Sequence, residues 1–264
     1  MGSDTEELTK SPLISVIVPA YNEQENIVPC TVAVRSALRK AGYDFEMLIV
    51  NDGSTDRTLE VAQAMQSKYP TVRVIDLVEN YGKTVALREG VKRAKGDLVA
   101  FFDADLQYSS DDLVRLIKRA NGSPNVISGK RDYGSYGGTR TSFSKLYNAI
   151  LRTVLRVPIA DSNCGLKVIS RSVTESDTVF RYGLPLIVPL LRIRGYDIEE
   201  VPVSLHDRKA GTSKYYSDGV FLGGWKNIRD ITYHSMMLLG LLMTMPFERK
   251  KNRSYIIGQH RNPQ

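Results

Sequence analysis

Short apolar runs alternate with amphipathic segments in the first part of the chain. Runs rich in β-branched residues, each ending in a polar loop, predict buried strands over 13–19, 45–51 and 72–77, and a fourth that begins near residue 99. Apolar positions at helical spacing predict a helix over 27–38, a second that runs towards Lys68 and a third that follows Lys83 and runs through Arg93. Ser54, Thr55 or Asp56 can cap the second.

This alternation predicts an α/β fold with a doubly wound, mostly parallel sheet. In such folds ligands bind at the carboxyl ends of the strands. The loops that begin at Ala20, Asp52, Asn80 and Asp103 should therefore share one edge of the sheet.

The second part of the chain is less regular. We expect a strand over 125–131, a Gly/Tyr/Ser-rich loop over 133–138, a helix over 139–157, a turn over 161–167 that enters another strand, a helix over 184–194 and a strand over 198–205. No linker divides the chain convincingly. The expected organisation is a polar N-terminal segment (1–12), one catalytic domain (13–218), C-terminal helices (219–247) and a basic tail (248–264).

The C-terminal apolar stretch at 231–247 admits two interpretations. A bilayer span needs about 20 predominantly apolar residues, and this stretch is shorter and contains His234. It could pack on the sheet as a core helix. Alternatively, it could lie in the membrane interface, anchored by Trp225 and by the basic tail.

Composition narrows the class of protein. The chain has 264 residues, of which 42% are hydrophobic and 25% charged, as in an ordinary globular protein. Cys30 and Cys164 lie far apart, which supports neither a disulfide framework nor a zinc site. A reducing, cytosolic setting is therefore the default. The N-terminus lacks the apolar core of a signal peptide, so nothing indicates export. A net charge of +7 fits nucleic acid, anionic lipid or phosphorylated substrates.

Asp103 and Asp105 follow the apolar run of the fourth predicted strand. If strand geometry persists that far, both carboxylates point one way and Ala104 turns towards the packing. Paired carboxylates suit Mg²⁺ or Mn²⁺, which share oxygen ligands with substrate phosphates. The competing interpretation is a helix cap or a solvated turn.

The strand-end loops together resemble those of the family 2 glycosyltransferases of GT-A fold, with the closest likeness to the synthases of dolichyl-phosphate or polyprenyl-phosphate mannose or glucose. The motifs that carry the resemblance are Pro19-Ala-Tyr-Asn-Glu23, Asn51-Asp-Gly-Ser-Thr-Asp56, Gly82-Lys83 and Asp103-Ala-Asp-Leu-Gln107. The likeness covers about residues 13–215. Most relatives carry Asp where this chain has Asn51. We therefore assign the expected nucleotide contact of this motif to Asp52 instead.

The resemblance implies a nucleotide-sugar site and a metal site. Asp105 and Gln107 would hold the Mg²⁺ or Mn²⁺ ion, and the implied nucleotide-sugar-binding residues are Pro19, Tyr21, Glu23, Asp52, Lys83, Asp103 and Ala104. Simpler roles remain open: Pro19 could be a turn residue, Tyr21 could pack, and Lys83 could be solvated.

The acceptor side is expected to bind a second phosphate. Arginine matches phosphate oxygens bidentately, and the candidates are Arg131, Arg140, Ser144, Arg208, Ser213 and Lys214. Arg131 and Arg208 join Asp105 as the expected catalytic residues. For any single arginine, a surface salt bridge is the alternative.

These expectations describe an inverting, metal-dependent glycosyltransferase that moves a hexose from GDP-mannose or UDP-glucose to dolichyl or polyprenyl phosphate, as a peripheral protein on the cytoplasmic face of a membrane. A phosphate monoester is already ionised near neutral pH, so no general base is required. One alternative transfers to a saccharide or protein hydroxyl, with Asp161 as the available base. Another is a nucleic-acid-binding module, but the aromatic-rich basic platform it would need is missing, so no nucleic acid is expected.

Overall fold

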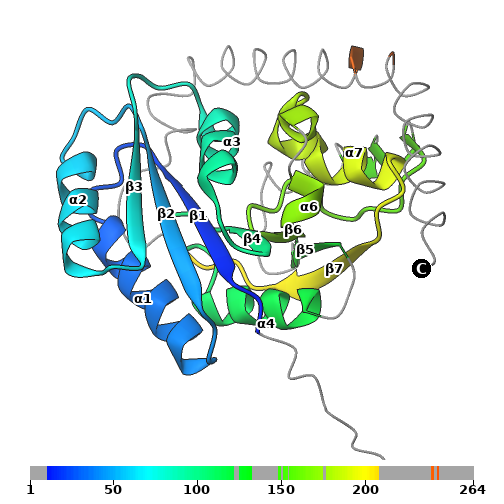
Figure 1. Ribbon diagram of the computed structural model, residues 1–264. Coiled ribbons are helices and arrows are strands. Elements are labelled where there is room, and N and C mark those ends of the chain that lie inside the picture. Colours follow the sequence, from blue (N-terminus) through cyan, green and yellow to red (C-terminus); the bar gives the residue numbers. More distant parts are fainter. Residues whose placement is uncertain are drawn as a thin grey trace, which may run out of the picture.

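The computed structural model describes residues 11–121, 125–132, 148–149, 151–153, 155–174, 177–207, 239–240 and 243. A seven-stranded mixed sheet with helices on both faces forms the described part of the chain (Figure 1). The strands are β1 (Ile14–Ala20), β2 (Phe45–Asp52), β3 (Val72–Leu77), β4 (Leu98–Phe101), β5 (Val126–Arg131), β6 (Lys167–Ser170) and β7 (Ile198–Val203). Their order across the sheet is β3-β2-β1-β4-β6-β5-β7.

The first four strands are parallel, as the βα alternation predicts. β6 then runs antiparallel to both β4 and β5, and β7 lies parallel to β5. Phe101, at the end of β4, pairs with Lys167, at the start of β6. The turn that precedes β6 therefore lies at the same edge of the sheet as the carboxyl ends of β1 to β4.

The strands bury both faces, which explains their nearly continuous apolar runs. In β4, Leu98 and Ala100 contribute to the core on one face, whereas Val99 and Phe101 contribute to the core on the other. The helical elements are α1 (Ile27–Lys40), α2 (Thr58–Lys68), α3 (Lys83–Arg93), α4 (Ser110–Ala120), α6 (Arg171–Thr174) and α7 (Ile187–Ile193), with the 3₁₀ turns η1 (Asp177–Phe180) and η2 (Leu184–Leu186). α1, α2 and α4 pack on the first face, and α3, α6 and α7 on the second.

Several predicted boundaries shift for local reasons. The helix expected over 184–194 begins as the 3₁₀ turn η2, which contains Pro185 and follows Gly183 at φ +80°. Helical residues at 148–149, 151–153 and 155 confirm part of the helix expected over 139–157. That helix stops before Val157, because Arg156 adopts φ +53°. None of α4, α6 and η1 was predicted.

The cap expected for α2 is displaced by one residue. Arg57 occupies the N-cap position and its side chain makes no capping bond. Instead, Asp56 Oδ1 accepts hydrogen bonds from the backbone N–H of Thr58 (2.9 Å) and from its hydroxyl (2.5 Å). Asp56 thus stabilises the start of α2 from just outside the helix.

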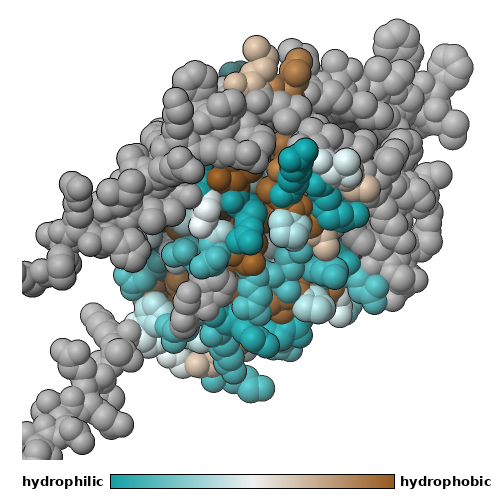
Figure 2. Space-filling view, turned by 90° about the vertical axis from the view of Figure 1, so that its right-hand side faces the viewer, coloured by the Kyte–Doolittle hydropathy of each residue, from teal (hydrophilic) through white to brown (hydrophobic). Residues whose placement is uncertain are grey.

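Hydrophilic side chains form most of the described surface on the side that carries α7 and β7 (Figure 2). The exposed large apolar residues of the described part are Val28, Val32, Val78, Tyr81, Leu239 and Met243. Among the described residues, no helix is both long and apolar enough to cross a bilayer. The expected boundaries at 218 and 247 lie outside the described residues.

Candidate active site

The loops after β1 and β2 are joined by hydrogen bonds. The backbone N–H of Asn22, which adopts φ +52°, donates to Ser54 Oγ (2.9 Å), and its side-chain Oδ1 accepts from the Thr55 N–H (2.8 Å). The Glu23 N–H donates to Thr58 Oγ1 (2.7 Å). These contacts confirm that the two loops share one edge of the sheet.

Asp52 connects the same edge to the loop after β3. Its two carboxylate oxygens accept the backbone N–H groups of Tyr81 and Gly82, each at 2.9 Å. Burial raises the pKa of Asp52, and these hydrogen bonds only partly oppose that effect. Gly53 adopts φ +63°, and a methyl group there would lie 2.3 Å from the carbonyl carbon of Glu79, so the approach of this loop requires glycine. Asp52 therefore fixes the loop after β3 against the end of β2, while its contact with base or ribose stays a prediction.

Lys83 and Asp103 form an ion pair at the centre of this edge. Lys83 is the first residue of α3, and its Nζ lies 2.5 Å from Oδ1 of Asp103, two residues beyond β4. Both side chains are partly buried, at 32% and 23% exposure. Lys83 is therefore paired at this edge and not fully solvated, while its contact with a nucleotide stays a prediction.

The second carboxylate, Asp105, lies in a turn. β4 ends at Phe101, so the expectation that strand geometry aligns Asp103 with Asp105 is wrong. Beyond that point the Phe102 N–H still donates to the Ile17 carbonyl (3.1 Å), but Leu106 adopts φ +56°, which no strand residue does. The burial predicted for Ala104 is confirmed, since it is 3% exposed.

Asp105 and Gln107 belong to the same short turn. Asp105, 6% exposed, accepts the Gln107 N–H on Oδ1 at 3.1 Å. Gln107 also pairs with the segment after β7, because the His206 N–H donates to its carbonyl oxygen at 2.8 Å. This turn therefore joins the two halves of the sheet.

The donor set of this turn suits a hard divalent cation. Within the described ranges, no cluster of three or more His, Cys, Asp or Glu residues could hold a metal by itself. One carboxylate, Asp105, and the amide oxygen of Gln107 leave most of a coordination sphere to be filled. Mg²⁺ and Mn²⁺ commonly complete theirs with phosphate oxygens and water, so these residues fit such an ion.

The remaining residues implied for the nucleotide site lie beside the loops. Pro19, the last but one residue of β1, pairs with Val50, and Tyr21 is half-buried. Glu23 lies just before α1: its carbonyl accepts the Ile27 N–H at 3.1 Å, and its Oε2 accepts Asn26 Nδ2 at 2.7 Å. Their contacts with a nucleotide stay predictions.

Asn51, the residue that departs from the family pattern, has a structural role. It is 2% exposed, and its Nδ2 donates to Asp76 Oδ1 on the neighbouring strand at 2.7 Å. Its Oδ1 accepts the Ser54 N–H at 3.4 Å. An amide can donate to Asp76, whereas a second carboxylate at this position would repel it.

Arg131 lies at the carboxyl end of β5 and forms a bidentate ion pair with Asp161. Its Nε and Nη2 each lie 2.8 Å from a carboxylate oxygen, and its backbone N–H donates to Oδ2 at 3.1 Å. Burial alone would raise the pKa of Asp161, but the hydrogen bonds and charge of Arg131 outweigh it and hold the pKa below its usual value. Asp161 is thus an ionised, fully buried partner of Arg131.

This pairing bears on both acceptor hypotheses. A carboxylate with a lowered pKa whose oxygens are engaged by a guanidinium is a poor general base, which argues against the hydroxyl-acceptor alternative. The proposed role of Arg131 at an acceptor phosphate stays a prediction. The other expected acceptor residues, Arg140, Ser144, Arg208, Ser213 and Lys214, lie outside the described residues.

Sequence reasoning missed four residues that surround residues 161–165, which we call the 161–165 turn. Glu200 accepts the Ala160 and Asp161 N–H groups, each at 2.8 Å. Asn148 Oδ1 accepts Ser162 Oγ at 2.9 Å, and the Tyr108 hydroxyl accepts the Gly165 N–H at 3.1 Å. Lys167, fully buried, donates to the Cys164 carbonyl. Of these four residues only Lys167 could have been noticed from the sequence, because a charged residue stands out inside the apolar run 166–169.

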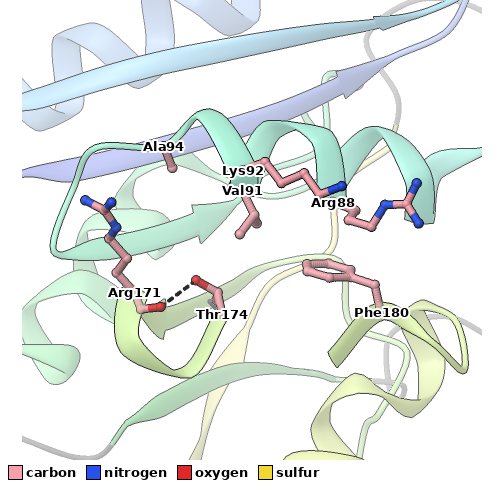
Figure 3. Close-up of a pocket in the computed structure, with 7 residues that line it drawn as sticks. All are labelled: Arg88, Val91, Lys92, Ala94, Arg171, Thr174 and Phe180. Atoms are coloured by element: carbon pink, nitrogen blue, oxygen red, sulfur yellow. Dashed lines mark hydrogen bonds between the residues drawn. The ribbon is translucent and has the colours of Figure 1, made fainter. Parts of the chain in front are cut away.

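A hollow elsewhere on the molecule is separate from this edge. It lies beside the amino end of β4 and is lined by Arg88, Val91, Lys92, Ala94, Arg171, Thr174 and Phe180 (Figure 3). Arg171 donates to the Lys95 carbonyl (3.1 Å) and Lys92 pairs with Glu89 (3.3 Å), so these cations do not converge on one point. The chemistry-bearing residues gather at the opposite ends of the strands.

Comparison with known proteins identifies the family of the chain. Residues 15–177 match the family model described as glycosyl transferase family 2. The undecaprenyl-phosphate 4-deoxy-4-formamido-L-arabinose transferase of Pseudomonas paraeruginosa is 32% identical over 204 residues, which cover 77% of this chain and 60% of that protein. The protein of the same name from Pseudomonas fluorescens is 29% identical, with 76% and 60% covered. The chain thus spans about 60% of the length of these relatives.

Solved structures show the fold. Mannosyl-3-phosphoglycerate synthase from Rubrobacter xylanophilus superposes with a TM-score of 0.64 at 16% identity, over 90% of this chain and 76% of that one. Glucosyl-3-phosphoglycerate synthase from Mycobacterium tuberculosis gives 0.59 at 19% identity, over 86% and 80%. The predicted GT-A-type fold is confirmed. Together with the family match over residues 15–177, these findings show that the chain belongs to glycosyl transferase family 2.

Proposed function

We propose that this protein transfers a sugar from a nucleoside diphosphate sugar to a polyprenyl phosphate, with inversion at the anomeric carbon and with the help of Mg²⁺ or Mn²⁺. The observation that carries the proposal is that two ion pairs, Lys83–Asp103 and Arg131–Asp161, lie at the same edge of the sheet. Lys83, Asp103 and Asp105 form a donor side, and Arg131, paired with Asp161, forms an acceptor side.

The reaction needs little covalent chemistry from the protein. A phosphate oxygen of the acceptor forms a bond to the anomeric carbon, while the bond from that carbon to the diphosphate breaks and its electron pair leaves with the nucleoside diphosphate. An ionised phosphate has no proton to lose, so the chain has to orient the two substrates and balance their charge.

The residues divide these tasks. Asp105 and Gln107 would hold the metal, which, when bound, stabilises the charge that develops on the leaving diphosphate. Lys83 holds the Asp103 carboxylate in place through their ion pair. Arg131 provides a guanidinium fixed by a buried carboxylate, and a fixed guanidinium loses little freedom when it binds an anion.

The names of relatives support this choice of acceptor. The curated relatives are named as undecaprenyl-phosphate transferases. The glucosyl-3-phosphoglycerate synthase of Mycobacterium tuberculosis was crystallised in complex with Mn²⁺, UDP and glucosyl-3-phosphoglycerate, so the fold accommodates a metal, a nucleotide and a phosphorylated product together. For the donor we keep GDP-mannose and UDP-glucose as candidates and add a nucleotide-linked 4-deoxy-4-formamido-L-arabinose from the relatives' name.

We also propose that the protein works at a membrane surface, on its cytoplasmic face. The described C-terminal residues support an interfacial helix. A methyl group at Gly240 would lie 3.6 Å from Tyr182 Cε1, so this helical residue faces the body of the protein. Leu239 and Met243, one turn apart, are 58% and 71% exposed. An apolar pair directed away from the core suits a lipid interface better than it suits water.

A transfer assay tests the proposed function. The purified chain is incubated with each candidate nucleotide sugar, with Mn²⁺ or EDTA, and with either a polyprenyl phosphate or the matching polyprenol. We expect a glycosylated lipid only with the phosphate and only with the metal. Equal transfer to polyprenol or to a free saccharide would overturn the acceptor assignment, and full activity in EDTA would overturn the metal.

A further inference from the structure

Gly165 lies directly against the carboxylate of Asp103. A methyl group at Gly165 would be 2.5 Å from Oδ2, 3.1 Å from Cγ and 3.2 Å from Oδ1 of Asp103. Atoms at such distances overlap, so one of the two residues would have to move. Gly165 is not among the described residues with positive φ, so a side chain is excluded by lack of space and not by backbone conformation.

Gly165 cannot easily retreat from Asp103. Its N–H donates to the hydroxyl of Tyr108 at 3.1 Å, and Tyr108 is 4% exposed. The preceding carbonyl, of Cys164, accepts the ammonium of the fully buried Lys167. The 161–165 turn is therefore held from behind by buried side chains, and any clash would displace the Asp103 carboxylate instead.

Asp103 is consequently confined on two sides. Lys83 Nζ lies 2.5 Å from Oδ1, and Gly165 closes the space beside Oδ2. The other end of the same turn carries Asp161, which fixes Arg131 through two bonds of 2.8 Å. One short turn thus connects the donor carboxylate with the acceptor arginine.

We propose that Gly165 is a positioning residue of the donor site, and that the 161–165 turn sets the place of Asp103 relative to Arg131. The inference rests on the proposed function, because it assigns Asp103 to nucleotide binding. Gly165 acts through Asp103 and does not itself touch the substrate.

The main test is Gly165→Ala, with affinity for UDP and GDP measured by calorimetry in the presence of Mn²⁺. We expect at least a tenfold loss of nucleotide affinity, and a rise in donor KM that exceeds any change in the acceptor KM. Unchanged affinity in a folded Gly165→Ala protein would overturn the proposal.

Gly96→Ala is the matched control for simple destabilisation. A methyl group at Gly96 would lie 2.6 Å from the Leu13 carbonyl oxygen and from the Ser15 nitrogen, at the opposite end of the sheet. It introduces a clash of similar severity far from Asp103. We expect a lower Tm with unchanged nucleotide affinity; a parallel loss of affinity would show that the Gly165 result reflects stability alone.

A double-mutant cycle separates a specific effect from a general one. In an Asp103→Ala protein the space beside residue 165 is vacant, so adding Gly165→Ala should change nucleotide affinity less than twofold. An undiminished further loss would contradict action through Asp103. Should Gly165→Ala fail to fold, Tyr108→Phe removes the hydroxyl that holds Gly165 without adding an atom, and we expect it to weaken nucleotide binding about threefold; wild-type affinity in that variant would overturn the proposal.

Nucleotide binding by the wild-type protein separates the two proposals. If it binds neither UDP nor GDP with Mn²⁺, the proposed function fails and the positioning role fails with it. If it binds one of them and Gly165→Ala binds equally well, only the positioning role is lost.

Discussion

The Lys83 ammonium lies 2.5 Å from the carboxylate of Asp103, so the first residue of α3 neutralises the first acidic side chain after β4. Removing this charge with Lys83→Met should leave Asp103 free to repel a bound diphosphate. We expect a fall in kcat/KM of about tenfold to a hundredfold, or about 1.4 to 2.8 kcal/mol, expressed mainly in donor KM. Lys92→Met, on the same helix but paired with Glu89, should leave the kinetics unchanged.

Asp105→Asn tests the metal site. The substitution keeps the size of the side chain and its bond with the Gln107 N–H, but it removes the charge that would bind the cation. We expect a loss of several kcal/mol of transition-state stabilisation with little change in Tm. Titrating Mn²⁺ against activity provides the measurement, and Asp111→Asn, at an exposed position in the first turn of α4, provides the control. Near-normal turnover of the folded variant would rule out direct ligation.

Arg131→Lys tests the acceptor side. Lysine cannot reproduce the two parallel bonds to Asp161, nor a bidentate grip on a phosphate. The KM for polyprenyl phosphate should rise at least tenfold, while affinity for the nucleotide changes little. The same is expected of Arg208→Lys. Equal losses of both affinities would instead assign these arginines to the donor diphosphate or to the fold.

Asp161→Asn should change how stability depends on pH. Because the folded pKa of Asp161 lies below the usual value of 3.8, its ionised form adds stability above that value. This contribution is lost as the pH falls from 3.8 through the lower folded pKa. Breaking a buried pair costs about 3 kcal/mol, so the variant should be less stable at pH 7, and the difference should narrow at pH 3. Denaturant unfolding at the two pH values measures this, and a constant difference would contradict it.

Leu239→Glu combined with Met243→Glu tests the membrane interface. The intact protein should co-sediment with anionic vesicles, and less so at high salt, since each basic residue near the surface contributes about 1 kcal/mol that salt screens. The double substitution should reduce binding at every salt concentration, because it removes apolar contacts. Deletion from Val220 onwards should abolish binding while short-chain, soluble lipid phosphates are still glycosylated.

The control for this experiment is Val28→Glu combined with Val32→Glu. These residues lie one turn apart on α1 and are also exposed, at 41% and 48%. They should not affect vesicle binding. If the two pairs of substitutions weaken vesicle binding equally, the loss comes from the added negative charge and not from lost apolar contacts. If the deletion from Val220 onwards unfolds the remaining protein, the C-terminal segment is part of the core.

The first half of the fold could be predicted because its strands are buried on both faces. Such strands appear in the sequence as unbroken apolar runs, and the polar motif that follows each run shows where the strand ends. The positions of Asp103 and Asp105 could not be predicted in the same way, since the strand ends at Phe101 and Asp105 lies in the turn that follows.

The remaining features of the site could not be predicted, because they are contacts between residues far apart in the sequence. The sequence shows neither that Lys83 pairs with Asp103 nor that Gly165 lies beside it, because each contact depends on how the strands are arranged in the sheet. A lysine within an apolar run is equally ambiguous. Burial lowers the pKa of Lys167, and the charge of Asp161 opposes part of that effect. Its ammonium also donates to the Cys164 carbonyl, so this buried donor has a partner.

The antiparallel insertion of β6 between β4 and β5 has a consequence for folding. All four motifs of the nucleotide side precede residue 108, yet Asp103 acquires its neighbour Gly165 only when the later strand β6 joins the sheet. A ribosome-bound or proteolytic fragment that ends at residue 121 would carry the whole motif set and still lack the wall against which Asp103 rests. Nucleotide binding should therefore appear late during synthesis, after β6 has paired.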